Sequence, residues 1–437
     1  MIKNIDDAYD YIYSFINLEN KIEKKYLNKE YSLDNIKNII RYFNIDTESF
    51  KIYHVAGTKG KGSVAYFISQ FLYYSGQDCA SFLSPHLIKP NERILFNLKA
   101  IGDEELIDLC SEIKDKLLRS NFMPTTFELF FLIFLLYSKK KGAKRLVVET
   151  GLGGRLDATN VLKSKVSVIT PIGYDHTNIL GDTIAEIAEE KAGIIKNDSI
   201  TVVSNQYYRC KEVFRRKAKE KCAKVYFLDD YFDLINATPT NFGLNCDFKF
   251  NRNRYNGINF NFFGEHQIYN FFTAFLSVFL YETKVINLLN DDMISKFNLF
   301  RGRIEVISRH PLIVVDVSHN KESARSLVDA LKLHFRDIKW VVISGIATDK
   351  DYKRYYKTLS EIADKFIITS LSEYKKSDPK IIFNYAKKIN KNSLFIEDQE
   401  SAFEYALKNA DIILATGSFY LVGPFIEYYE KEYYEKN

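Results

Sequence analysis

The alternation of apolar runs and amphipathic segments along the chain predicts an α/β protein. Continuous apolar runs, such as residues 145–149 and 166–170, are typical of strands covered on both faces of a parallel sheet. Helical spacing follows several of these runs: after a strand at 51–56, apolar residues between 64 and 72 recur on one helix face. We therefore predict doubly wound sheets, in which ligands bind at the carboxyl ends of the strands.

The same pattern divides the chain into two parts. A first series of strands and helices runs to about residue 290, after which the alternation restarts. A length of 437 residues also exceeds what one hydrophobic core organises. We predict two doubly wound domains, residues 1–297 and 298–437. The predicted strands are 51–56, 78–83, 145–149, 166–170, 200–204, 224–228, 304–308, 312–316, 340–344, 366–370 and 411–415; the predicted helices of the first part are 5–17, 33–43, 103–119, 126–140 and 266–283.

One segment has a different pattern of apolar and polar residues. Residues 246–263 alternate apolar and polar positions on either side of Asn256-Gly257. An Asn-Gly pair between two alternating runs is a strong hairpin signal, because both residues tolerate a left-handed backbone. We predict a hairpin that turns at this pair.

Composition and charge exclude several classes of protein. Hydrophobic residues make up 46% of the chain, which indicates a folded protein, and the net charge of +5 is scattered, which argues against a nucleic-acid partner. The five cysteines contain no CxxC pair and are interpreted as reduced thiols of a cytoplasmic protein. The N-terminus is acidic where a signal peptide is basic, and the apolar stretches near 127–137 and 271–280 are too short to span a membrane. No membrane partner is expected.

The strongest chemical signal is HVAGTKGKGS at residues 54–63. It leaves a predicted strand and opens a predicted helix. Gly57, Gly60 and Gly62 allow backbone N–H groups to surround a phosphate, and the helix N-terminus adds partial positive charge. Lys61 supplies a full charge, and Ser63 supplies a hydroxyl for Mg²⁺. The alternative is a glycine-rich turn with incidental lysines.

Four other polar residues each have a purely structural interpretation. Glu149 ends a buried strand, where a carboxylate can bind Mg²⁺ or cap a helix. His176 follows Asp175, which could orient it, although a single histidine is usually structural. By composition alone, Lys191 is an exposed lysine paired with Glu186 or Glu190. Asp316 is a candidate helix N-cap.

The ordered motifs of the chain resemble those of the folylpolyglutamate synthase and dihydrofolate synthase family, within the Mur ligase superfamily. The resemblance covers residues from about 51 to 423. It implies an N-terminal P-loop ATPase domain of Mur ligase type and a smaller C-terminal α/β domain, the glutamate-ligase domain. The matching segments are GTKGKGS (57–63), SPHL (84–87), NERI (91–94), ETGLGGRLDATN (149–160), DHTNILG (175–181), EKAGIIK (190–196), GEHQIYN (264–270), RGRIE (301–305), DVSHN (316–320) and TGSFYLVG (416–423).

The resemblance also implies roles for individual residues. Lys61, Lys191 and His319 are expected to be catalytic. The lysine that matches Lys191 is often carbamylated in the superfamily, which requires a neutral amine. Mg²⁺ is expected on Ser84, Glu149 and His176. ATP is expected on Gly57, Thr58, Lys59, Gly60, Lys61, Gly62, Ser63, Asn270, Arg303 and Asp316; the folate-type acceptor is expected on Tyr31, Ser32, Leu33, Thr125, Leu156, Asp157 and Ala158.

The implied reaction is ATP-dependent addition of L-glutamate to a folate or pteroate acceptor through an acyl phosphate, by a monomer that needs Mg²⁺ and uses ATP as co-substrate. Dihydropteroate, reduced folate, or both remain open as acceptors. The weaker alternatives are a cell-wall Mur-type amino-acid ligase and a non-catalytic nucleotide-binding regulator. The chain departs from the family pattern at Ser32, where relatives often carry glycine, at Lys321, where proline is usual, and in 372–379, which lacks an expected arginine.

Overall fold

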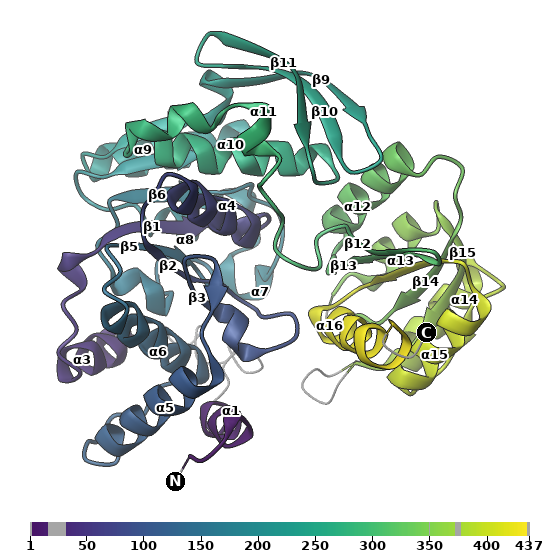
Figure 1. Ribbon diagram of the computed structural model, residues 1–437, viewed down its shortest axis with the longest axis horizontal. Helices are drawn as coiled ribbons and strands as arrows, with labels where there is room; N and C mark the ends of the chain where they lie inside the picture. The colour runs from purple at the N-terminus through teal and green to yellow at the C-terminus, as the bar shows by residue number, and fades with distance from the viewer. Residues whose placement is uncertain (1, 16–31, 349, 372–376, 435–437) are drawn as a thin grey trace. The chain divides into compact units, whose positions relative to one another are not determined.

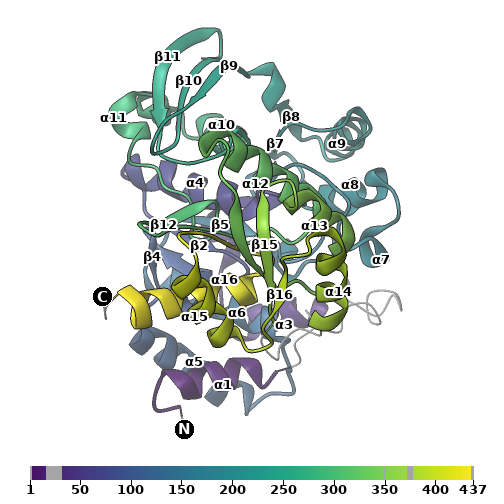
Figure 2. The same cartoon turned by 90° about the vertical axis from the view of Figure 1, so that its right-hand side faces the viewer.

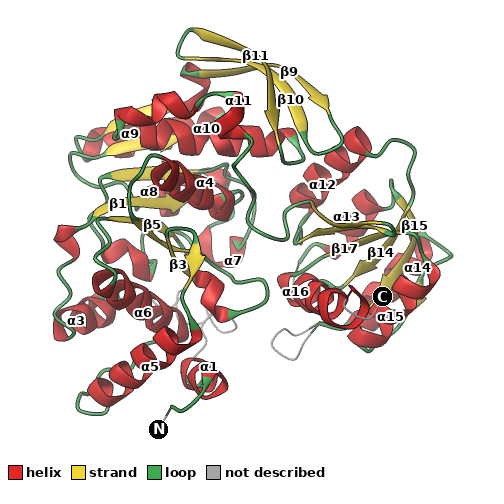
Figure 3. Ribbon diagram, viewed as in Figure 1, coloured by secondary structure: helices red, strands yellow, loops and turns green. Residues whose placement is uncertain are grey.

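The structure is a computed structural model that describes residues 2–15, 32–348, 350–371 and 377–434. Its contacts divide the chain into two compact units. The first unit contains Met1–Ile235, Phe248–Asn256 and Ile268–Phe297, and the second contains Asn236–Asp247, Gly257–Gln267 and Asn298–Asn437. In each unit, helices and strands alternate along the chain (Figure 3).

The first unit is built on a mostly parallel sheet. In the described residues this sheet has eight strands in the order β4-β3-β2-β5-β1-β6-β7-β8, and only β3 and β4 run antiparallel to their neighbours. The strands are β1 (Lys51–Ala56), β2 (Cys79–Phe82), β3 (Ile94–Phe96), β4 (Lys99–Ala100), β5 (Arg145–Glu149), β6 (Val166–Ile169), β7 (Ile200–Val203) and β8 (Lys224–Phe227). The predicted α/β class is confirmed.

The topology places one strand at the point where the chain reverses direction across the sheet. Strand β1 lies between β5 and β6, and the chain leaves β1 through helix α4 (Lys61–Tyr74) to reach β2 on one side. Strand β6 pairs with the other side of β1 (Figure 1), and β7 and β8 extend the sheet beyond it (Figure 2). Ligands of doubly wound folds bind outside the carboxyl end of the strand at such a reversal. The loop after β1 therefore occupies the expected ligand position.

Helices cover both faces of this sheet. One face is buried beneath α1, α3, α5 and α6, which share a single hydrophobic cluster with β1, β2 and β5. Helices α4 and α10 pack together through phenylalanine rings, with the Phe71 and Phe271 ring centroids 4.9 Å apart. The helices of this part of the chain are α1 (Ile5–Tyr13), α3 (Asp34–Tyr42), α5 (Asp103–Leu117), α6 (Thr126–Lys140), α7 (Thr177–Leu180), α8 (Ile184–Ala192), α9 (Tyr208–Glu220), α10 (Glu265–Phe279) and α11 (Asp291–Ile294).

A separate antiparallel sheet, β11-β10-β9, is formed by β9 (Phe232–Pro239), β10 (Leu244–Phe250) and β11 (Asn253–Phe260). The predicted turn at Asn256-Gly257 is wrong: this pair lies inside β11, and the chain turns at Asn251 and Arg252, which have φ of 46° and 72°. The position of the turn is set by tertiary packing. Phe248 and Phe250 alternate onto α10, so β10 must extend to Phe250 before the chain can turn.

The second unit carries its own sheet, which in the described residues has the order β12-β13-β17-β14-β15-β16 and is parallel except for β12. Helices α12 to α14 cover one face, and α15 and α16 lie on the other (Figure 2). The elements are β12 (Glu305–Arg309), β13 (Leu312–Asp316), α12 (Lys321–His334), β14 (Trp340–Ser344), α13 (Tyr352–Leu359), β15 (Ala363–Ile368), α14 (Pro379–Ile389), β16 (Leu394–Phe395), α15 (Gln399–Asn409), β17 (Ile412–Thr416) and α16 (Phe419–Tyr428).

Two composition-based expectations can be compared with the structure. All five cysteines are free thiols, and only Cys222 is exposed. No helix in the described ranges combines the length and apolar character that a membrane crossing requires.

Candidate functional site

The loop between β1 and α4 accepts only glycine at two positions. Gly57 has φ of +152°, and a Cβ atom there would lie 1.8 Å from Oγ1 of Thr170. Gly60 has φ of +77°, and a Cβ atom would lie 2.5 Å from Oδ1 of Asn270. Any side chain at either position would collide with its neighbour. The glycines therefore bring the loop backbone directly against Asn270, which the sequence assigned to ATP.

The amide groups of this loop have different roles. Those of Thr58 and Lys59 donate to the carbonyl of Pro171, at 3.1 and 3.2 Å, and hold the loop to the segment after β6. Residues 61–63 form the first turn of α4, where a helix supplies no backbone acceptor for its amides. Gly60 is the N-cap and makes no side-chain cap. These first-turn amides, together with the helix dipole, make a suitable cradle for an anion.

Glu149 and Ser84 come together beside this helix. Glu149 ends β5 and is 3% exposed. Its Oε2 atom accepts the amide N–H of Ser84 at 2.9 Å, and a Cβ atom on Gly62 would lie 3.5 Å from the same oxygen. The glycine loop, Ser84 and Glu149 thus converge, as expected for strand ends at one edge of a parallel sheet.

His176 lies at the N-cap of α7 in a left-handed conformation, with φ of 49°. Its Nε2 atom is 3.8 Å from Oδ1 of Asp175, and its side chain is 46% exposed, so it is not a core histidine. Within the described ranges, no group of three or more His, Cys, Asp or Glu side chains is arranged to hold a metal. The predicted metal set contains only two such residues, and Glu149 with Ser84 is the part that the structure joins directly.

Lys191 is buried and points to the glycine loop between β1 and α4, which we propose below as the ATP loop. Its side chain is inside the protein at the end of α8, with the residue 4% exposed, and Nζ donates to the carbonyl of Gly57 at 2.8 Å. Burial, together with the nearby charge of Lys61, lowers the pKa of Lys191 to about 7. A large fraction of this amine is therefore neutral near pH 7.

The interpretation of Lys191 as an exposed lysine paired with Glu186 or Glu190 is wrong. Glu186 closes the capping box of α8 by accepting the amide of Thr183 at 2.9 Å. Glu190 pairs with Arg155, whose Nη2 atom is 2.9 Å from Oε1. Glu186 is exposed and Glu190 is partly buried, whereas the side chain of Lys191 enters the core.

Three segments that were assigned to the acceptor lie together in the structure. The side-chain amide of Asn35 donates to the carbonyl of Met123 and to Oε2 of Glu128, both at 3.3 Å. A Cβ atom on Gly151 would lie 2.7 Å from the ring of Phe127. The starts of α3 and α6 and the loop after β5 therefore form one neighbourhood.

Within it, several assigned residues have structural partners. The Ser32 hydroxyl donates to Asp34 at 2.7 Å, and Thr125 is the N-cap of α6, accepting the amide of Glu128 at 3.2 Å. Leu33 packs against the helical core, Leu156 is half-buried, and Ala158 is 2% exposed. Tyr31 lies outside the described residues.

Asp157 stabilises the loop after β5 from inside. Its carboxylate is buried and accepts the amide of Leu152 at 2.9 Å and the amide of Thr159 at 3.0 Å. Burial raises the pKa of Asp157, and these hydrogen bonds oppose the shift. The carboxylate therefore holds the loop's own backbone.

In the second unit, Asp316 at the end of β13 organises the Arg303 segment. Its buried carboxylate accepts the amide of Ile304 at 3.0 Å and that of Ser318 at 2.8 Å. Burial raises the pKa of Asp316, while the charge of Arg303 opposes the shift. Ile304 has φ of 48°, a strained conformation for a β-branched residue. The guanidinium carbon of Arg303 lies 5.0 Å from the ring centroid of Phe419.

The alternative interpretation of Asp316 as a helix N-cap is wrong, because Asn320 has that position. The side chain of Asn320 accepts the amide of Ser323 at 2.9 Å and begins α12. His319 precedes this cap, and its Nδ1 atom is 3.0 Å from the carbonyl of Val317. Its ring is therefore oriented by the backbone, with the other ring nitrogen directed elsewhere.

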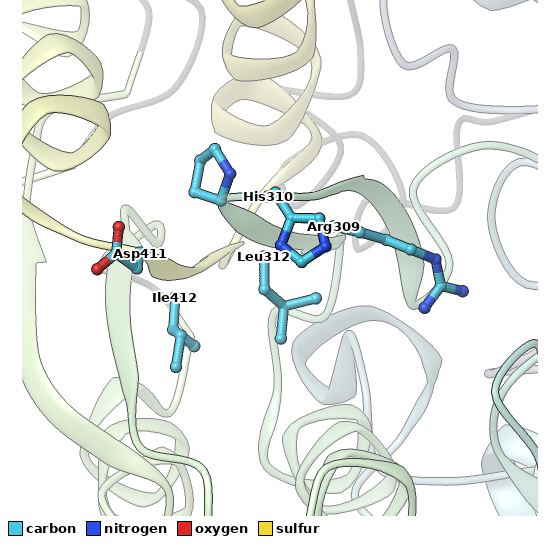
Figure 4. Close-up of a pocket in the computed structure, with 6 residues that line it drawn as sticks. Arg309, His310, Leu312, Asp411 and Ile412 are labelled. Carbon is cyan, nitrogen blue, oxygen red and sulfur yellow. The ribbon is translucent and has the colours of Figure 1, made fainter.

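A cavity of about 400 Å³ in the second unit lies away from these residues. It is lined by residues 309–312 and 411–412 (Figure 4). Leu312 and Ile412 begin strands β13 and β17, whereas Asp316 ends β13. This cavity is at the amino ends of the strands, opposite to the end where ligands of doubly wound sheets bind.

Two polar residues of the first unit were not predicted. His54 and Thr159 are fully buried, and His54 Nε2 lies 2.8 Å from Thr159 Oγ1. A signal for His54 was present in the sequence, because it is the polar residue inside an otherwise apolar buried run. Thr159 carried no such signal, since its partner is 105 positions away.

Comparison with known proteins places this arrangement in a family. The model of the Mur ligase middle domain matches residues 55–278, and that of the Mur ligase glutamate ligase domain matches residues 302–419. The dihydrofolate synthase/folylpolyglutamate synthase of Bacillus subtilis is 31% identical over 399 residues, covering 89% of this chain and 93% of that protein. The chain belongs to the folylpolyglutamate synthase and dihydrofolate synthase family of Mur ligases.

Other members of the family agree in sequence and fold. The folylpolyglutamate synthase of Lacticaseibacillus casei is 31% identical over 312 residues, covering 68% of this chain and 72% of that protein. The folylpolyglutamate synthase of Mycobacterium tuberculosis, solved with ADP and AMPPCP, has a TM-score of 0.83 at 26% identity, with 92% of this chain and 96% of that chain covered. The predicted family is thus confirmed.

Proposed function

We propose that this protein is a ligase that uses ATP to join L-glutamate to a folate-type acceptor. The observation that carries the proposal is the glycine loop at the end of β1, in which Gly57 and Gly60 pack closely against Thr170 and Asn270 and α4 begins at Lys61 with no side-chain cap. Membership of the folylpolyglutamate synthase and dihydrofolate synthase family supplies the substrate class.

The chemistry requires activation of a carboxylate, because a carboxylate oxygen is a poor leaving group for attack by an amine. The acceptor carboxylate attacks the γ-phosphorus of ATP, which forms an acyl phosphate and releases ADP. The amine of glutamate then attacks the acyl carbon, and the tetrahedral intermediate expels inorganic phosphate and loses a proton to leave the amide. The main demand on the protein is to hold two anions close together.

Positive groups of the first unit can neutralise the charge of these two anions. Lys61 and the first-turn amides of α4 are positioned to neutralise phosphate charge during transfer. In the second unit, Arg303 is fixed by the ring of Phe419, and the buried carboxylate of Asp316 organises its segment. We propose that Arg303 and Asp316 bind the nucleotide.

The residues present fit Mg²⁺. The Glu149 carboxylate is a hard oxygen donor that is buried against the glycine loop and fixed by the Ser84 amide. We propose that Glu149, Ser84 and His176 hold the ion, which when bound neutralises phosphate charge. Histidine is an unusual ligand for Mg²⁺, so His176 is the part of this set that most needs a test.

We expect Glu149→Gln and His176→Ala each to reduce kcat/KM by about 100-fold or more, because each removes a ligand that stabilises charge in the transition state. Both variants should also need more Mg²⁺ for half-maximal rate, measured by Mg²⁺ titration at saturating ATP. Glu282→Gln is the matched control, since Glu282 pairs with Arg145 at the opposite end of β5. An unchanged Mg²⁺ requirement in both site variants would place the metal elsewhere.

The decisive assay of the function offers purified protein ATP, Mg²⁺ and labelled glutamate, with dihydropteroate and tetrahydrofolate supplied separately. We expect labelled product and ADP in equal amounts with at least one acceptor. Product with the first alone indicates a dihydrofolate synthase, with the second alone a folylpolyglutamate synthase, and with both a bifunctional enzyme. ATP turnover that is independent of either acceptor, with no labelled product, would refute the proposal.

A further inference from the structure

The loop after β5, residues 150–160, is joined to β1 by a buried chain of hydrogen bonds; we call it the acceptor loop. Nε2 of His54 lies 2.8 Å from Oγ1 of Thr159, and the same hydroxyl contacts Oδ1 of Asp157. All three side chains are buried, with His54 and Thr159 at 0% exposure. These contacts cross from the central strand of the sheet to a segment about 100 residues later.

The hydrogen-bonding capacity of each side chain determines which group donates and which accepts in these hydrogen bonds. Both oxygens of Asp157 already accept backbone amides, Oδ1 from Thr159 and Oδ2 from Leu152, so the carboxylate acts only as an acceptor. The Thr159 hydroxyl must then donate to Asp157. Its lone pair accepts from His54, which places the imidazole proton on Nε2.

The other ring nitrogen of His54, Nδ1, is buried and makes no hydrogen bond to the described residues. Burial keeps the pKa of His54 well below its usual range, so the ring stays neutral. A buried imidazole with one unsatisfied nitrogen is costly. The donor bond from Nε2 to Thr159 is the one polar interaction that this residue makes among the described side chains.

The acceptor loop has a second attachment, at the end of α8. The amide of Arg155 donates to the carbonyl of Glu190 at 2.8 Å, and a Cβ atom on Gly154 would lie 2.9 Å from the carbonyl of Lys191. Lys191 in turn donates to Gly57 in the ATP loop. The acceptor loop and the ATP loop are therefore fixed to the same two elements.

Strand β1 provides the shorter link. His54 and Gly57 are three residues apart, which corresponds to about 10 Å along a strand. His54 holds the acceptor loop, and Gly57 begins the ATP loop. Any shift of one loop relative to β1 changes its distance from the other, and an error of about 1 Å in the placement of reacting groups can cost 100-fold in rate.

We infer that His54 and Thr159 are positioning residues that hold the acceptor loop at a fixed distance from the ATP loop, so that the acceptor carboxylate meets the phosphate. This inference rests on the proposed function. It goes beyond the proposed function by assigning a task to two buried residues that are not among the residues assigned to ATP, metal or acceptor.

The test replaces Thr159 by valine, which removes the hydroxyl but keeps nearly the same side-chain shape. In Thr159→Val, Asp157 loses one of its donors and His54 loses its side-chain partner, so we expect the KM for the acceptor to rise about 10-fold or more and kcat to fall. The KM for ATP should stay within about 2-fold, and Thr159→Ser, which keeps the hydroxyl, should restore near-normal values. Thr201→Val is the matched control, because Thr201 is equally buried and its hydroxyl has no hydrogen-bond partner among the described residues.

A second readout does not depend on activity. Amide hydrogen exchange at Leu152 and Thr159 should accelerate in Thr159→Val and in His54→Phe, and remain unchanged in Thr201→Val. One outcome is that wild-type protein forms no glutamate-containing product while exchange at Leu152 and Thr159 still accelerates in the variants. In that case the proposed function fails, but the role of His54 and Thr159 in holding the acceptor loop stands. If Thr159→Val matches Thr201→Val in both acceptor KM and exchange, or if the KM values for ATP and acceptor rise equally, the positioning role is overturned.

Discussion

Replacement of Lys61 by alanine is expected to lower kcat/KM for ATP-dependent glutamate addition by about 1,000-fold, with no loss of folded protein. Lys61 opens α4 next to Gly60, and its charge is near enough to Lys191 to depress the pKa of that amine. We propose that Lys61 lies close to the position that a transferring phosphate would occupy. Removal of a preorganised positive donor from such a site typically costs 100- to 1,000-fold in rate, about 3–4 kcal/mol.

The fold should tolerate this change because alanine is a good helix former at the first position of α4. Thermal unfolding and far-UV circular dichroism should match wild type. Lys163→Ala is a suitable control, since that lysine is exposed and pairs with Glu48. Lys61→Arg should recover only part of the rate, because a guanidinium has a different shape from an ammonium. Near-normal turnover of Lys61→Ala would refute the assignment of the glycine loop to ATP.

The second large effect is expected at Lys191, where activity and stability should move in opposite directions. Lys191→Met removes the amine but keeps the volume, and we expect kcat to fall by 100-fold or more. Our hypothesis is that the neutral amine takes up CO₂ to form a carbamate, releasing one proton, and that the resulting anion supports the metal. Lys191→Ala should then regain some activity with acetate, which can fill the vacated position.

The stability of the unliganded protein, without Mg²⁺ or bicarbonate, follows from the pKa of Lys191. This pKa is about 7 in the folded state, well below the usual lysine value, so the unfolded chain binds the proton more tightly. Wild-type stability should therefore rise with pH above 7, and part of that rise should be absent in Lys191→Met, which should be the more stable protein at pH 7. Urea unfolding at pH 7 and pH 9 measures this difference.

A carbamate can also be observed directly. Wild-type protein with Mg²⁺, nucleotide and ¹³C-bicarbonate should show a carbamate carbon resonance that is missing in Lys191→Met. Lys196→Met is a useful comparison, because burial lowers the pKa of Lys196 to about 8 but its Nζ atom donates to Asn160. Equal resonances in wild type and Lys191→Met would refute the modification at Lys191.

Local sequence patterns were sufficient for most of the elements. The apolar run at 145–149 became β5, and the predicted helix at 126–140 became α6, because burial on both faces and helical period are encoded by neighbouring residues. The hairpin turn was mispredicted for the opposite reason. Asn256-Gly257 has the right turn chemistry, but the packing of Phe248 and Phe250 on α10 determined where β10 ends.

For the site, the sequence by itself determined the strand, glycine loop and helix start that we propose bind ATP, since these residues are contiguous and their geometry is local. The burial of Lys191 and the bond from His54 to Thr159 were decided only by the tertiary structure. Lys191 has the helical context of a surface residue, and its lowered pKa arises from desolvation by segments distant in sequence. Thr159 meets His54 only because β1 and the acceptor loop are packed together, and no local pattern records the partner that a buried polar group will find.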